Sequence, residues 1–171
     1  MDDVDKLWID QNVFINDNYA INPWTIGVAT FDGLDETGYP HDWSASGATG
    51  WADDLTSKPI DLSSYSIADS VYISFFYQAG GLGNAPESDD SLVLEFYLPS
   101  TSSWQSLWGI NGFTSDEWYY EHLILDDPTY FQNGFQFRFR SYGSLMGSLD
   151  HWNLDYVYLN ETRSGADTLM N

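Results

Sequence analysis

The 171-residue chain has no cysteine, few basic residues and no long apolar run. The absence of cysteine excludes disulfides, thiolate metal sites and cysteine nucleophiles. Lysine and arginine total 5 against 26 acidic residues, which gives a formal net charge of −21. Binding a phosphate backbone takes clustered basic side chains, so nucleic acid and anionic membrane surfaces are disfavoured as partners. No segment has the roughly 18 consecutive apolar residues of a membrane-spanning helix.

What the chain has is enough apolar surface for one core. Hydrophobic residues make up 43% of it and aromatic residues 18%, far above a disordered composition. We therefore expect a single domain over residues 1–171, with a core from about residue 8 to 160 and frayed ends. The charge makes cations the natural counter-partners: dissolved ions, Ca²⁺ or a basic protein surface.

Short runs rich in β-branched and aromatic residues alternate with Gly, Pro, Asn, Asp and Ser clusters along the whole chain, without sustained helical periodicity. This spacing predicts an all-β, two-sheet antiparallel sandwich, with loops at 32–50, 79–90 and 142–150 carrying any site. The predicted strands cover residues 12–16, 25–31, 57–62, 70–78, 91–98, 104–109, 119–125, 134–141 and 152–159.

The side-chain alternation predicts which face of each strand is buried. Residues 91–98 place four apolar side chains on one face and Val, Glu and Tyr on the other. Residues 70–78 are apolar on both faces, which is typical of a central strand. Pro59 removes a ladder donor, so residues 57–62 begin at Pro59 or run along an edge.

The segment FQFRFRSYG, residues 135–143, contains two of the five basic side chains. Residues two apart in a strand share a face, so Arg138 and Arg140 point away from the three phenylalanines that alternate with them. We expect the phenylalanines in the core and the arginines paired with carboxylates of neighbouring strands, Glu95 among them. A binding role for the arginines is the alternative.

The order of several segments resembles a known family. SKPIDLSSYSIADSVYISFFYQAGGLG, SLVLEFYL, WQSLWGING, DEWYYEHLIL, FQFRFRSYG and DHWNLDYVYL, within residues 57–159, resemble MAM-like and cleaved-adhesin-like jelly rolls. GVATFDGLDETGYPHDW looks like segments of surface and secreted proteins from gliding, polysaccharide-degrading bacteria of the Bacteroidetes type. The resemblance implies a concanavalin-like or MAM-like jelly roll in an extracellular or cell-surface protein with further domains.

The chain departs from this family at two points. Eukaryotic MAM domains carry disulfide cysteines, which are absent here, and their terminal motif is usually Asp-Asp where this chain has Asp155 and Tyr156. The fold therefore transfers more safely than the function.

The segment DGLDETGYPHD crowds Asp32, Asp35, Glu36 and Asp42 into a loop with two glycines. Ca²⁺ takes six to eight oxygen ligands from flexible loops, so this segment is a candidate calcium site, although it lacks the spacing of an EF-hand. By the resemblance, a structural Ca²⁺ joins the loop to the last strand, which makes Asp32, Asp35, Glu36 and Asp155 the predicted ligands. The alternative is a solvated acidic turn. Asp53 and Asp54 are further candidates.

Asp155 shares a strand face with Val157 and Leu159 if the alternation is unbroken. A carboxylate that begins a buried face needs a cation or several donors, and Ca²⁺ or one of the two arginines supplies it. The alternative is that the four aromatic and leucine side chains of this strand face inward, which leaves Asp155 exposed.

Eight tryptophans and twelve tyrosines are more aromatic side chains than a core of this size needs. Aromatic rings stack on the apolar faces of sugars while Asp, Asn and Gln bind hydroxyls, so exposed rings on a sandwich suit a glycan ligand. Tyr39, Asp42, Trp43 and Trp51 flank a Gly/Ser-rich loop and are the predicted ligand-binding residues. The alternative is that most of the rings fill the core.

No catalytic motif is present: there is no G-x-S-x-G, no H-E-x-x-H and no E-x-D-x-E strand. His41, His122 and His151 are dispersed and predicted to be surface or packing residues, and GGLGNAP at 80–86 is predicted to be a turn rather than a dinucleotide loop. The sequence thus predicts a non-catalytic extracellular adhesion or ligand-binding module stabilised by Ca²⁺. A carbohydrate-binding module is the alternative and a glycoside hydrolase the third possibility.

Overall fold

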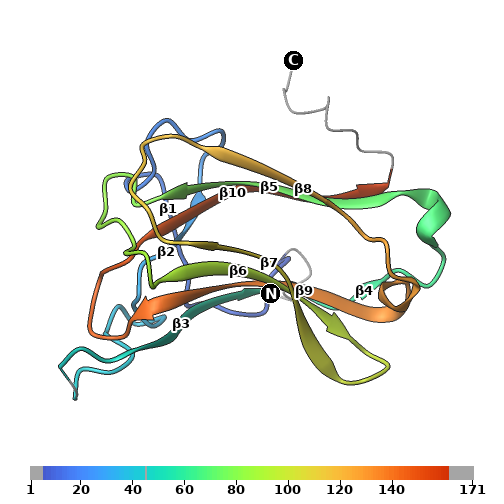
Figure 1. Cartoon of the computed structure of the whole chain (residues 1–171), viewed down its shortest axis with the longest axis horizontal. Helices are drawn as coiled ribbons and strands as arrows, with labels where there is room; N and C mark the ends of the chain where they lie inside the picture. Colours follow the sequence, from blue (N-terminus) through green and yellow to red (C-terminus); the bar gives the residue numbers. More distant parts are fainter. Residues whose placement is uncertain (1–5, 45, 162–171) are drawn as a thin grey trace.

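Two antiparallel sheets packed face to face form the protein in a computed structural model that describes residues 6–44 and 46–161 (Figure 1). The predicted fraying concerns residues 1–5 and 162–171, which lie outside the described residues. One sheet has the order β1-β2-β10-β5-β8, with bounds Phe14–Asn16, Val28–Phe31, Trp152–Glu161, Val71–Ala79 and Tyr119–Ile124. The other has the order β3-β9-β6-β7, bounded by Thr49–Thr56, Asn133–Ser144, Ser91–Leu98 and Ser103–Asn111, and the short β4, Ile60–Asp61, pairs with β9.

The chain winds between the two layers as a jelly roll does. It leaves β5 in the first sheet for the β6–β7 hairpin in the second, returns for β8, crosses again to β9 and ends in β10 of the first sheet. The predicted two-sheet antiparallel sandwich is therefore confirmed. The helical segments Ile67–Asp69 and Pro128–Tyr130 are single 3₁₀ turns, and no helix of the described residues is long and apolar enough to cross a membrane.

Nine of the ten strands in the described residues lie where the sequence predicted them, and β5 is flanked by strands on both sides as expected. β4 starts directly after Pro59 and pairs only with β9, as the missing amide donor requires. The prediction missed β3, whose sequence TGWADDLT contains two adjacent aspartates, a residue type that is depleted in strands. The predicted loop at 32–50 therefore ends where β3 begins.

The core lies between the sheets and is largely aromatic. Phe135, Phe137 and Phe139 of β9 are buried as predicted, and Phe75 of β5 meets Phe139 edge to face with ring centroids 4.8 Å apart. The apolar side chains of β6 at positions 92, 94 and 96 are also buried, which confirms its predicted inner face. Each such side chain contributes about 1.5–3 kcal/mol to folding by its burial, so the β9 alternation fixes the direction of the arginines.

β10 contains an irregularity that neither sequence prediction anticipated. The register with β5 shifts between Asp155 and Tyr158, and Tyr156 has a φ of 54°, as expected of a β-bulge. Trp152 and Leu154 therefore face the core before the bulge, and Val157 packs against the core after it. The predicted unbroken alternation is wrong: Asp155 lies on the outer face, yet it is 4% exposed.

The connections β2–β3, β5–β6, β7–β8 and β9–β10 gather at one end of the sandwich, on the left of Figure 1, and we call this the loop end. The β1–β2 connection reaches the same end, where the backbone amide of Leu82 donates to the Tyr19 carbonyl oxygen. The three loops predicted to carry a site thus belong to one end of the molecule.

Candidate functional site

The predicted calcium ligands are not brought together. The Asp32 carboxylate is buried and accepts from the Leu34 amide, whereas Asp35 caps its own turn through Thr37 and the Tyr39 amide. Among the described residues, no group of three or more potential metal-ligating acids includes Asp32, Asp35, Glu36 or Asp155. For Asp35 the alternative of a solvated acidic turn fits, because Thr37 and the turn amide lower the pKa of its carboxyl group.

Asp155 is satisfied by donors of the protein itself. Its carboxylate accepts from the Thr25 amide at 2.9 Å, from the Thr25 hydroxyl at 2.5 Å and from the Tyr156 amide at 2.8 Å. Neither arginine is its partner, because Arg138 and Arg140 pair with carboxylates of the other sheet. Asp155 therefore fastens the β1–β2 connection onto the outer face of the first sheet.

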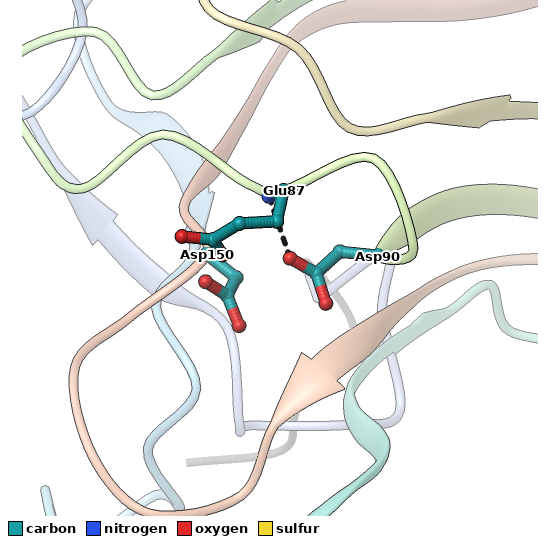
Figure 2. A group of neighbouring side chains, drawn as sticks. All are labelled: Glu87, Asp90 and Asp150. Atoms are coloured by element: carbon teal, nitrogen blue, oxygen red, sulfur yellow. Dashed lines mark hydrogen bonds between the residues drawn. The ribbon is translucent and has the colours of Figure 1, made fainter.

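A different acidic cluster lies at the loop end. Glu87, Asp90 and Asp150 present carboxylate oxygens that all lie within 4.8 Å of one another, as Figure 2 shows. Asp90 and Asp150 are more than nine-tenths buried, whereas Glu87 is exposed. The Glu87 amide donates to Asp90 at 2.7 Å and the Ser144 amide donates to Asp150 at 2.7 Å. The cluster thus joins two of the predicted site loops, at 79–90 and 142–150.

The cluster is electrostatically unfavourable at neutral pH. Burial, with the neighbouring Asp150 and Glu87 charges, raises the pKa of Asp90 to about 6, and burial together with Glu87 and Asp89 raises the pKa of Asp150. A cation or a proton would relieve this repulsion. One oxygen of Asp90 and one of Asp150 already accept an amide, so the cluster offers about half of the oxygens that Ca²⁺ prefers.

A second buried network surrounds Asp53, which is fully buried. Its carboxylate accepts from the Gly33 amide at 2.9 Å and meets His41 Nε2 at 3.0 Å. The hydrogen bond to Asp53 raises the pKa of His41, while burial and the Asp53 charge raise the pKa of Asp32 to about 6. Asp53 therefore holds the start of the β2–β3 connection and is not free to be the metal ligand considered from the sequence.

His151 connects three loops at the same end. Its ring stacks on Tyr19 with centroids 4.8 Å apart, Nδ1 lies 2.9 Å from the Asn84 amide and Nε2 lies 3.0 Å from the Ser148 hydroxyl. Burial lowers the pKa of this histidine. The predicted packing role is confirmed for His151, and His122 likewise stacks on Tyr72 at 4.2 Å.

The predicted ligand-binding residues lie in two places. Tyr39 and Trp43 stand on the β2–β3 connection with ring centroids 5.9 Å apart, and they are 57% and 73% exposed. Asp42 caps its own turn through Ser44, so its carboxylate is already engaged. Trp51 instead lies in β3, 45% exposed, with its ring edge to face with Tyr142 of β9.

Trp51 belongs to a continuous polar and aromatic surface on the outer side of the second sheet. Arg138 Nε donates to Glu95 at 2.6 Å, as predicted, and Arg140 Nε donates to Asp54 at 2.6 Å. We call this surface the arginine face. It consists of Trp51, Asp54, Glu95, Tyr97, Trp104, Arg138, Arg140 and Tyr142.

The two guanidinium groups of the arginine face also lie over tryptophan rings. Arg138 Cζ is 4.1 Å from the centroid of Trp104, and Arg140 Cζ is 4.5 Å from that of Trp51. Such cation–π contacts contribute about 0.5–1 kcal/mol at exposed sites. Asp54, considered from the sequence as a metal ligand, is therefore an ion-pair partner. The pairing with Trp104 was missed because the bulge in the β6–β7 register sets which β7 side chains face outward.

No protein-family model matches the chain, and no curated protein matches it. Among solved structures, a family 16 carbohydrate-binding module is similar with a TM-score of 0.47 and 13% identity, over 90% of each chain. A carbohydrate-binding module specific for non-crystalline cellulose, CBM28, has a TM-score of 0.47 and 15% identity, over 90% of this chain and 85% of the other. TmCBM61, solved in complex with β-1,4-galactotriose, has a TM-score of 0.41 and 12% identity, over 91% of this chain and 99% of the other.

Proposed function

We propose that the chain is a non-catalytic carbohydrate-binding domain, the alternative that the sequence left open. The observation that carries the proposal is the arginine face, where Trp51 and Trp104 are held by stacked guanidinium groups. Rings fixed in advance lose little conformational entropy when a sugar stacks on them. Arg138 Nε donates to Glu95 and Arg140 Nε donates to Asp54, both at 2.6 Å, and a terminal N–H of Arg140 also donates to Asp54 at 3.5 Å, so these ion pairs hold the guanidinium groups in place over the rings.

The carboxyl groups support a binding role over hydrolysis. A glycosidase places two carboxyl groups about 5–9.5 Å apart across a cleft, and its acid has a raised pKa. Here the carboxyl groups with raised pKa, on Asp32, Asp90 and Asp150, are more than nine-tenths buried.

We also propose that Glu87, Asp90 and Asp150 hold a structural Ca²⁺ that fastens the β5–β6 connection to the β9–β10 connection. This replaces the predicted set, which joined the β2–β3 connection to Asp155 of β10. The proposal is supported by the donor type, by the mutual distance of the oxygens and by the raised pKa of the two buried acids. The same proposal places the domain in a larger extracellular or cell-surface protein, because free Ca²⁺ is abundant outside the cell.

Adhesion to a protein surface is the second candidate. It is favoured by Tyr39 and Trp43, which are exposed side by side on a connection that extends from the loop end. A basic partner would suit the net charge of −21.

Affinity electrophoresis tests the carbohydrate proposal. The protein is run in gels that contain soluble neutral β-glucans, mannans, galactans or xylans, with a release assay for reducing ends in parallel. We expect at least one polysaccharide to retard the protein without cleavage, and the double variant Trp51→Ala, Trp104→Ala to lose at least about tenfold in affinity, which equals about 1.4 kcal/mol. Retardation by no polysaccharide, or cleavage of one, would contradict it.

A further inference from the structure

The β1–β2 and β7–β8 connections enclose a groove of about 480 Å³ on the opposite side of the molecule from the arginine face. It lies at the loop end, against the outer side of the first sheet. The groove is lined by Ile21, Asn22, Trp24, Asp116, Glu117 and Trp118.

One fully buried amide fixes both walls of the groove. The Gln78 Oε1 atom accepts from the Ile21 amide at 2.9 Å, while Nε2 donates to the carbonyl oxygens of Ile21 and Asp116 at 3.1 and 2.8 Å. Trp118 Nε1 donates to the Ile21 carbonyl oxygen at 2.7 Å and joins the walls directly. The groove is therefore formed before any ligand arrives, which lowers the entropic cost of binding.

The two indoles supply the apolar surface of the groove. Trp24 packs against Phe76 of β5 with ring centroids 4.9 Å apart, yet it remains 44% exposed. The N–H group of Trp118 is already bonded, so this residue offers ring surface rather than a donor. Flat indole surfaces in a preformed concavity match the C–H faces of a pyranose ring.

The polar side chains of the groove are available for a ligand. Asn22, Asp116 and Glu117 are exposed, and within residues 6–44 and 46–161 none of the three side chains makes a hydrogen bond or ion pair. A carboxylate can accept from two adjacent hydroxyl groups, and a side-chain amide can both donate and accept. Two carboxylates, in a chain of net charge −21, also disfavour anionic sugars.

We propose that this groove is a second glycan site, which binds a pyranose unit of an uncharged glycan between Trp24 and Trp118 with its hydroxyl groups on Asp116 and Glu117. The inference rests on the proposed carbohydrate function. It assigns the hydrogen-bonding selectivity of the domain to the groove, because the polar groups of the arginine face already bond to one another.

The test is isothermal titration with oligosaccharides of the polysaccharide that retards the wild-type protein. We expect Trp24→Ala to weaken binding at least about tenfold, and Asp116→Asn and Glu117→Gln to weaken it several-fold, with unchanged unfolding temperatures for the two acidic variants. Ile67→Ala and Asp126→Asn, which change exposed residues at the opposite end of the sandwich, are the matched controls and should bind like the wild type.

A second readout covers the case in which Trp24→Ala folds poorly. The indole N–H resonance that disappears in Trp24→Phe identifies Trp24, and it should shift when the oligosaccharide is added to the wild-type protein. If Asp116→Asn and Glu117→Gln bind normally and this resonance does not move, the groove is not a glycan site, even where Trp51→Ala, Trp104→Ala weakens binding. Absence of any oligosaccharide binding to the wild type would overturn both the groove site and the proposed function.

Discussion

The two outer faces of the sandwich use polar side chains in opposite ways. On the arginine face, Arg138 and Arg140 bond to Glu95 and Asp54, and the side chains of Arg138 and Glu95 are only 17% and 13% exposed. In the groove, the side chains of Asp116 and Glu117 are exposed and make no hydrogen bond or ion pair in the described part of the chain. Polar side chains of the arginine face therefore stabilise the folded state, whereas those of the groove are available to the ligand that we propose for it.

The largest expected contrast is in stability. Glu95→Gln removes the charge that neutralises Arg138 in a mostly buried pair, so we expect the free energy of unfolding to fall by about 2–4 kcal/mol. Glu117→Gln in the groove should change it by less than about 0.5 kcal/mol. Urea unfolding followed by tryptophan fluorescence measures both. Equal losses of unfolding free energy in the two variants would remove the distinction between the faces.

The second contrast concerns glutamine. Gln78 is fully buried with three hydrogen bonds, whereas Gln136 beside the arginine face is half-buried and donates to the Ser57 carbonyl oxygen. We expect Gln78→Ala to cost about 2–3 kcal/mol, since it leaves buried backbone groups without partners, and Gln136→Ala about 1 kcal/mol or less. Only Gln78→Ala should also weaken oligosaccharide binding. Normal binding in Gln78→Ala would show that the groove does not need fixed walls.

A third prediction separates the loop end from both faces. The pKa of Asp90 is raised to about 6, so its contribution to stability is full below about pH 3.8 and is lost as the pH rises through 6, and the raised pKa of Asp150 acts in the same direction. Without divalent ions at pH 7.5, Asp150→Asn should raise the melting temperature by about 2–4 °C, with little change at pH 4. Oligosaccharide affinity should stay the same.

Added Ca²⁺ completes this experiment. It should raise the melting temperature of the wild-type protein at pH 7.5 and leave that of Asp150→Asn nearly unchanged, because a ligand of the native state stabilises it. Asp126→Asn serves as the control for loss of one negative charge. If neither Ca²⁺ nor chelator changes the melting temperature of the wild-type protein, the calcium proposal is refuted and the groove proposal is unaffected.

The smallest expected effect is that of salt. The affinity for an uncharged glycan should change less than about twofold between 0.05 and 0.5 M NaCl. Salt screens exposed charges but does not weaken the stacking of sugar rings on indoles. Adhesion to a basic protein would weaken steeply over the same range. Titrations at the two salt concentrations therefore decide between the carbohydrate and adhesion proposals.

Alternation within strands was enough to predict most of the fold. Period-two patterns predict the faces of β6 and β9, the Arg138–Glu95 pair and the central position of β5. A register shift by one residue would expose the apolar face of a strand, so these patterns allow one register. β3 was not predicted because its buried Asp53 depends on an interaction with His41, which lies twelve residues away in a loop. The strand propensity of single residues contains no information about such a partner.

The structure does not bring the predicted calcium ligands together, for a physical reason. Carboxylates crowded in sequence, as in the 32–42 segment, bond to their own turns, whereas the cluster of Glu87, Asp90 and Asp150 is assembled from two connections. The groove likewise joins residues almost one hundred positions apart through Gln78. Such sites depend on which loops meet, and local sequence does not encode this.

The bulge in β10 divides one strand into two halves of opposite phase. Trp152 and Leu154 face the core in the first half, and Val157 and Leu159 do so in the second. Tyr156 is the extra residue of the bulge, so deleting it alone would restore a regular ladder and leave both apolar pairs facing the core. One further inserted residue would instead shift one half against the other and turn its apolar side chains into solvent. An insertion in this strand is therefore far more damaging than loss of the bulge residue.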